Sequence, residues 1–598
     1  MRSKRGFWLA FGLIATLSFA SFMPSATVAA PGSRILDRIK DINPFKGYGV
    51  DPRKGRFVEK QVAIRTIPAP VTTAGALGFG ALEQGDLQKA RLNMPITEGL
   101  IATFLTELDS KWTYARYGKL KVYLIASGQY QAIARPDGSM TVALGMLNQA
   151  ESDDELAFMF SHELMHIRLN HFARDQKVGQ MRQIATQANA LFTDAVAVSQ
   201  MRVRSSGDNF NVYTEDQKKV ASAASRAAAA KRQMDILLSV LVDTPWARRD
   251  EDEADVGGFD IAKMASYSPA RVAPIAFGRM KADYDARAEM TKIAKAQLTE
   301  SVGILSQETL KVLESGSGKI SVETIFRESS ANMLSNGFGV IVKFFEQKHR
   351  LPADRQKGLN NYINVAHGFT KPAPLKAELI TKIKSTKEFK DGVIVVTALQ
   401  KSMTARANGD GPAAVAAMAT TRNTQFAAAP TVANESAMAF DAGGNFAAAE
   451  AQFILANKSP EQTLDGYSDY IDLLIKVGNY RKAFDVAKAG AVRYKDEKPF
   501  LPALLATSFR TGKKDLAATY MSKCMATENA SIKNACLLAV TDPRYQKQYD
   551  ALPAHTRALA DSELEKKSSQ ASVAPGSTLL RALNGLIKGQ TDDADTSE

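Results

Sequence analysis

The sequence predicts an α+β domain, mostly helical with a small sheet, followed by an all-α solenoid of helical repeats. A strand and a hairpin pattern lie between helical stretches within residues 93–275, which predicts the α+β domain. A repeat in the last third of the chain predicts the solenoid. At 598 residues the chain is long enough for several domains, each with its own hydrophobic core.

The composition is that of a folded protein. The chain has 45% hydrophobic and 23% charged residues, which excludes a wholly disordered or fibrous protein. The net charge of +13 suits an anionic partner such as a nucleic acid or a lipid surface. No zinc-finger spacing, aromatic ribonucleoprotein motif or phosphate-binding glycine loop accompanies that charge. We therefore expect a basic solvated surface and no nucleic-acid partner, while peripheral association with a membrane stays open.

The first 29 residues have the layout of a secretory signal peptide. Basic residues precede an apolar run from Phe7 to Met23, and small residues follow it. Pro31 would block cleavage after Ala30, so we place the cut after Ala29 and expect export to the periplasm. An uncleaved membrane anchor is the alternative, because an apolar run of this length nearly spans a bilayer.

The α+β domain begins, after an N-terminal extension at 30–92, with a helix, a strand and a hairpin. Apolar residues recur at helical spacing in 96–112, and 119–126 reads as a strand. Two alternating runs around Asp137 and Gly138 predict the hairpin.

A second helix follows at Ser152, which can cap it, and acidic residues occupy its first turn. From Phe172 to Val242 the pattern is helical again, with a loop at 205–216.

The segment HELMH, residues 162–166, lies on this second helix and carries the candidate chemistry. Positions four apart lie about 40° apart around a helix axis, so His162 and His166 project from one face. Two neutral imidazoles so placed can hold Zn²⁺ with bonds of about 2.1 Å. Glu163 can reach a water on the metal without being a ligand. His171 lies about 180° round the helix from His162, so it cannot share that metal, and we expect a structural histidine there.

A catalytic zinc needs a third protein ligand and one open position. The segment ARRDEDEAD, ending at Asp255, supplies it on another predicted helix. Glu251 would be the ligand, and Asp255, on the same face, would accept a hydrogen bond from a ligand imidazole and fix its tautomer. Glu253 points elsewhere. A solvated charged face is the alternative for these acidic residues.

Glycines recur every 34 residues near the C-terminus, at Gly444, Gly478 and Gly512. The period is that of the tetratricopeptide repeat, in which the glycine fits the turn between two helices. An alanine five residues after each glycine lets those helices approach closely. An unrelated helical array is the alternative.

The remaining segments carry less information. We expect a helical connector at 276–395, the repeat domain at 396–540 and a partly disordered tail at 541–598. Cys524 and Cys536 are the two cysteines of the chain, and both a disulfide across a helix hairpin and two buried free thiols fit their spacing.

Together, HELMH, the later His171, ARRDEDEAD and the hairpin segment at 131–147 resemble the HtpX/BepA-type zinc metallopeptidases, relatives of the CAAX prenyl proteases. With the signal peptide and the tetratricopeptide repeats, the chain most resembles the BepA-like periplasmic branch. The resemblance implies a zincin-type metallopeptidase domain at 93–275 that holds one Zn²⁺ per chain through His162, His166 and Glu251. Glu163 would be the catalytic base, and Asp255 would support a ligand imidazole.

The resemblance also implies a role in protein quality control. The enzyme would hydrolyse unfolded or misassembled envelope proteins, which would add to an exposed edge at 139–145 as an extended strand. The repeats would recruit protein partners, such as outer-membrane assembly machinery. The other function that we consider is a tetratricopeptide-repeat chaperone or scaffold with a closed or little-used protease site.

Overall fold

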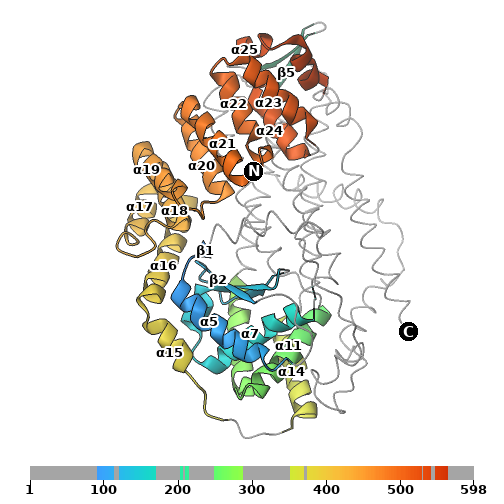
Figure 1. The fold of residues 1–598 in the computed structure, drawn as a ribbon, viewed down its shortest axis with the longest axis vertical. Helices are drawn as coiled ribbons and strands as arrows, with labels where there is room; N and C mark the ends of the chain where they lie inside the picture. The colour runs from blue at the N-terminus through green and yellow to red at the C-terminus, as the bar shows by residue number, and fades with distance from the viewer. Residues whose placement is uncertain are drawn as a thin grey trace, which may run out of the picture.

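The structure of the protein is a computed structural model that describes residues 91–112, 120–135, 137–169, 171, 202–206, 209–213, 248–286, 351–368, 373–527, 529–540 and 546–562. Figure 1 shows the sheet and the helices around it in the lower half of the view, and the C-terminal helices rising above them. The strands are β1 (Arg91–Leu92), β2 (Lys121–Ile125), β3 (Ala132–Ala134), β4 (Ser139–Ala143), β5 (Arg202–Ser206) and β6 (Asn209–Tyr213). The helices of the lower half are α5 (Pro95–Asp109), α6 (Leu144–Gln149), α7 (Asp153–Arg168), α11 (Arg248–Met264), α14 (Pro352–Ala366) and α15 (Glu378–Ser385). The helices that follow are α16 (Lys387–Ala407), α17 (Gly411–Ala419), α18 (Pro430–Ala442), α19 (Phe446–Asn457), α20 (Leu464–Lys476), α21 (Tyr480–Tyr494), η3 (Lys498–Phe500), α22 (Leu501–Arg510), α23 (Lys514–Ala526), α24 (Ala530–Val540) and α25 (Gln546–Asp550).

The small sheet has four strands in the order β1-β2-β4-β3. β3 and β4 form the predicted hairpin, and Gly138 in its turn has a φ of 79°. β4 also pairs with β2, in parallel. The expectation that 139–145 forms an exposed sheet edge is therefore wrong, because β4 is hydrogen-bonded on both sides. The edge strand on this side of the described sheet is β3.

Helix α7 is at the centre of the helical layer, where it packs against α11, α5 and β3. Ser152 caps it as expected, because its hydroxyl oxygen accepts the Glu155 N–H at 3.2 Å. At the other end, the Arg168 guanidinium donates two hydrogen bonds of 2.7 Å to Asp109, at the end of α5. Both residues are buried, and the two parallel hydrogen bonds of the planar guanidinium group fix the position of α5 along α7.

Acidic side chains from distant segments cap several helix N-termini in this layer. The carboxylate of Glu388, on α16, accepts the Thr97 N–H at 2.8 Å, at the start of α5. Asp153, on α7, accepts the N–H groups of Leu379 and Ile380 at the start of α15. These first-turn N–H groups have no partner within their own helix, so a buried carboxylate there satisfies them and complements the helix dipole. Packing of α5, α7, α15 and α16 thus depends on contacts across more than 220 residues.

The described part of the predicted connector belongs to the core of the α+β domain. One hydrophobic cluster contains side chains from Leu92 to Ala439, including Leu359 and Tyr362 of α14. A second cluster runs from Ala437 to Ala560. The change from one core to the next therefore falls near α18, which lies inside the segment predicted as the repeat domain.

The C-terminal helices form consecutive antiparallel pairs, α18 with α19, α20 with α21, and α22 with α23. Gly444, Gly478 and Gly512 lie in the turn inside each pair, with φ values of 76°, 80° and 70°. The alanines five residues later are all fully buried, as the spacing predicts; they are Ala449, Ala483 and Ala517. The tetratricopeptide identity of these pairs stays a prediction. Cys524 and Cys536 form a disulfide between α23 and α24, which decides between the two alternatives for these cysteines.

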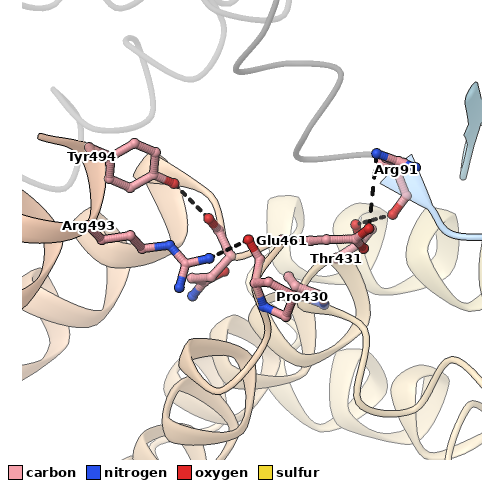
Figure 2. A pocket seen from close by; sticks show the side chains of 8 residues that line it. Arg91, Pro430, Thr431, Glu461, Arg493 and Tyr494 are labelled. Carbon is pink, nitrogen blue, oxygen red and sulfur yellow. Dashed lines mark hydrogen bonds and ion pairs between the residues drawn. The ribbon is translucent and has the colours of Figure 1, made fainter.

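A pocket of about 260 Å³ lies where β1 meets the helical pairs. Figure 2 shows Arg91 on one side of it, Arg493 and Tyr494 on the other, and Glu461 between them. The Thr431 hydroxyl donates a hydrogen bond of 3.0 Å to the backbone carbonyl oxygen of Arg91. These contacts connect the first strand of the sheet with helices more than 300 residues later.

Two further predictions concern residues 202–213 and the C-terminal tail. Residues 202–206 and 209–213, where the sequence predicts a helix that runs into a loop, form the antiparallel strands β5 and β6. Of the predicted tail, 546–562 is described and holds α25 and a helical stretch at 554–562.

The predicted signal peptide lies outside the described residues, as does most of the N-terminal extension. Among the helices that the structure describes, none is long and apolar enough to cross a membrane.

Candidate metal centre

Helices α7 and α11 lie very close together at His162. A Cβ atom on Gly258, in α11, would lie 2.7 Å from the backbone nitrogen of His162 and 2.8 Å from its Cα. No side chain fits at those distances, so only glycine allows the two helices to lie this close. The contact brings the acidic residues of α11 over the histidines of α7.

The three predicted ligands converge at this contact. The Nε2 atoms of His162 and His166 lie 3.1 Å apart. Glu251 Oε2 lies 3.6 Å from His162 Nε2, and Glu251 Oε1 lies 3.9 Å from His166 Nε2. The three residues, all buried, form a group that could hold a metal ion.

This donor set fits Zn²⁺. Ligands at about 2.1 Å from a tetrahedral centre are about 3.4 Å from one another, close to the separations found here. Two neutral imidazoles and one carboxylate are also a common ligand set of catalytic zinc, with a fourth position left open. The centre would therefore be held by His162, His166 and Glu251.

Asp255 and Glu163 lie beside these three residues in the places expected for them. Asp255 Oδ1 is 3.0 Å from His162 Nδ1, so it can accept that proton and leave Nε2 as the donor atom. Glu163 Oε1 is 3.8 Å from His162 Nε2, and its Oε2 accepts the Ala134 N–H of β3 at 2.7 Å. Glu163 is therefore held between the edge strand and the candidate metal ligands.

The ionisation of Glu163 and His166 suits the chemistry. Burial raises the pKa of Glu163 to about 7, although His162 and the Ala134 N–H oppose the shift. A carboxylate with such a pKa is suited to accept and return a proton near neutral pH. Burial is the main cause that lowers the pKa of His166 well below its usual range, so its imidazole is in the neutral form that a metal requires.

Arg355 is a site residue that the sequence did not reveal. It comes from α14, and its guanidinium lies 2.6 Å from Glu251 Oε2 and 2.6 Å from Asp255 Oδ1. Burial alone would raise the pKa of Asp255, but Arg355 and His162 outweigh it and lower that pKa to about 2. Arg355 thus keeps Asp255 ionised in a buried site and forms an ion pair with Glu251. Its segment carries no recognisable motif, and only the packing of α14 on α11 brings it here.

The other histidines of the chain are not among the three converging residues. His367 Nε2 lies 2.8 Å from Asp260 Oδ1, and its ring packs between Phe259 and Tyr362, which is a structural role. His349 lies outside the described residues. His171 is not one of the converging ligands, as expected, but it does not point away from them: α7 ends at Arg168, so the helical angle does not carry on to His171. Its ring contacts His166 instead.

The close approach at Gly258 gives a testable prediction. The Gly258→Ala substitution should push α11 away from α7, destabilise the protein by about 1–3 kcal/mol and weaken zinc binding at least about tenfold. Thermal unfolding and competition with a chromophoric chelator would measure the two effects.

Gly257→Ala is the matched control for this prediction. Its Cβ would meet the Met165 side chain, at 2.7 Å from Cε and 3.0 Å from Cγ and Sδ, and this flexible side chain can shift more readily than the His162 backbone. If both variants bind zinc as tightly as the wild type, the close approach does not set the geometry of the centre.

Comparison with known proteins agrees with this geometry. No curated protein matches the chain. Residues 104–347 match the family model described as Peptidase family M48. The matched segment includes β2, β3, β4, α7 and α11, and so all five predicted site residues, whereas Arg355 lies beyond it. The similarity of residues 104–347 to peptidase family M48 indicates that this chain carries a metallopeptidase domain.

Proposed function

We propose that the protein is a zinc-dependent endopeptidase that acts on unfolded or misassembled proteins of the cell envelope. The observation that carries the proposal is the convergence of two imidazoles and one carboxylate, with a second carboxylate, Glu163, beside them. Metal ligands alone would fit a structural site. The buried Glu163, with a pKa near 7, adds the proton acceptor that hydrolysis needs.

The residues of the chain have distinct tasks in this reaction. Zn²⁺, when bound, would supply Lewis acidity for the scissile carbonyl group and lower the pKa of a water molecule. Glu163 would take a proton from the attacking water and then deliver it to the leaving amine nitrogen. Asp255 would hold the tautomer of His162, and Arg355 would hold Asp255 through its two hydrogen bonds.

Edge strand β3 offers a place for an extended substrate. Arg135 and Gln131 make their backbone hydrogen bonds to residues 139 and 143, so the alternation of an antiparallel pair turns the backbone groups of Ala132 and Ala134 away from β4. The Ala134 N–H faces Glu163. A peptide that adds to β3 as a strand would therefore pass beside the catalytic base. Backbone pairing requires little of the side chains, which suits unfolded chains as substrates.

The role of Glu163 can be tested by Glu163→Gln. The amide cannot accept the proton, so cleavage of an unfolded protein should fall by about 10²- to 10⁴-fold, while the variant should keep one zinc per chain. Cleavage assays and metal analysis of the purified chain would check both. A wild type that binds zinc but cleaves nothing would support the alternative, a chaperone or scaffold with a little-used protease site.

The role of β3 can be tested by Ala132→Pro, which removes one outward N–H without removing a ladder hydrogen bond. The KM for an unfolded substrate should rise about tenfold, with zinc content unchanged. Ala132→Ser keeps the N–H and is the control. Equal KM values for the two variants would contradict substrate pairing along β3.

We also propose that the chain is exported to the periplasm and that its helical pairs bind protein partners, including outer-membrane assembly machinery. The tripartite N-terminus supports export. Large exposed apolar side chains on the helical pairs support partner binding; among them are Phe446, Val477 and Val492.

The export proposal predicts a mature chain that begins at Ala30. Mass spectrometry of the periplasmic fraction of a Gram-negative host should find this N-terminus, and deletion of 1–29 should leave the protein in the cytoplasm. A chain that keeps its first residues and stays in the membrane fraction would show an anchor instead.

A further inference from the structure

A second buried histidine cluster lies directly behind the metal ligand His166. His171 Nδ1 is 2.8 Å from His166 Nδ1, and the two rings meet nearly edge to face. On its other side, His171 Nε2 is 3.1 Å from Glu253 Oε2 and 3.9 Å from Asp250 Oδ1. All four side chains are buried. Glu253 was expected to point elsewhere than Glu251, and it does so by facing this histidine.

This cluster has two possible uses. His171, Asp250 and Glu253 each offer a ligand atom within 4.8 Å of the others, so by geometry the group could hold a second metal ion. The same atoms could instead form a chain of hydrogen bonds that supports His166. The hydrogen bond between the two histidines decides between these uses.

The direction of that hydrogen bond follows from the first metal centre. His166 Nε2 faces His162 Nε2 and Glu251, so it is the atom that would bind the metal. A neutral imidazole that binds through Nε2 has its proton on Nδ1. His166 Nδ1 must then donate to His171 Nδ1, which accepts. The proton of a neutral His171 is therefore on Nε2, where it is donated to Glu253.

The two metal sites therefore exclude each other. A metal at the second cluster would use the Nε2 lone pair of His171 and place its proton on Nδ1. His166 Nδ1 would then have to accept a hydrogen bond from His171 Nδ1. The proton of His166 would be on Nε2, where it would prevent this atom from binding a metal at the first centre. Two neutral imidazoles cannot satisfy both centres across one shared hydrogen bond.

We propose that His171 and Glu253 are positioning residues that orient His166 through the chain Glu253–His171–His166, and that the second cluster holds no metal. The inference rests on the proposed metal centre at His162, His166 and Glu251. Each ligand histidine then has an acidic residue of α11 behind it: Asp255 contacts His162 directly, and Glu253 reaches His166 through His171. The buried surroundings strengthen this chain, which fixes the ring of His166 and makes it a better electron donor.

The test compares His171→Leu with His171→Asn in the full-length mature chain. Leucine cannot accept the proton of His166, so zinc affinity in a competing-chelator titration should fall about 10- to 100-fold. Asparagine is smaller than histidine, but its side-chain oxygen can occupy the place of His171 Nδ1 and still accept that proton, so it should retain most of the affinity. Wild type and both variants should bind no more than one zinc per chain.

Two further measurements separate positioning from a general loss of structure. The visible spectrum of the Co²⁺-substituted protein should change in His171→Leu and remain close to that of the wild type in His171→Asn. Glu253→Gln keeps an acceptor for His171 but removes the charge, so zinc affinity should fall below that of the wild type, by less than in His171→Leu. If the leucine variant fails to fold, this fall relative to the wild type is the test.

Three outcomes would overturn the inference. Two zinc ions in the wild type, with one lost in Glu253→Gln, would show a second metal site. Zinc affinity and Co²⁺ spectra unchanged in His171→Leu would show that His166 needs no support, while the proposed function would still stand. A wild type that binds no zinc would overturn the proposed function and this inference together.

Discussion

The close contact between α7 and α11 is the constraint on which the candidate centre depends. Gly258 allows the backbones to approach so closely that no side chain fits between α11 and His162. At this separation the short carboxylate side chains of Glu251 and Asp255 reach the imidazoles of α7. A wider spacing between the helices would leave Glu251 too far away to share a metal ion with the histidines, and Asp255 too far away to accept the His162 N–H. The histidines would then be two buried polar groups in need of other partners.

The cost of this contact is a high density of buried charge. Asp250, Glu251, Glu253 and Asp255 are all buried on one helix, where uncompensated carboxylates would be strongly destabilising. The compensating groups come from other parts of the chain: Arg355 from α14 for Glu251 and Asp255, and His171 for Glu253. Stability and chemistry are therefore linked here. Arg355 both compensates the buried charge of Asp255 and lowers the pKa of that carboxyl group.

Compensation of buried groups by distant segments also explains why the segment after 276 cannot be separated from the α+β domain. Glu388 caps α5, Asp153 caps α15, and Arg355 completes the charge balance of the centre. Each contact joins segments at least 100 residues apart. Sequence patterns identify helices in this segment, but not their partners, because the propensity of a helix depends on its own residues and not on what packs against it.

Local features of the sequence were sufficient for the helices around the motif, the cap at Ser152, the hairpin at Gly138 and the glycine turns of the helical pairs. Each depends on residues within one or two turns of chain, so spacing alone determines it. The sequence also determined that His162, His166 and Glu163 share one helix. Tertiary structure decided which strand is the edge, that Arg355 joins the site and that His171 lies behind His166. These depend on how separate elements pack, because a side chain hundreds of residues away leaves no local pattern at the position that it contacts.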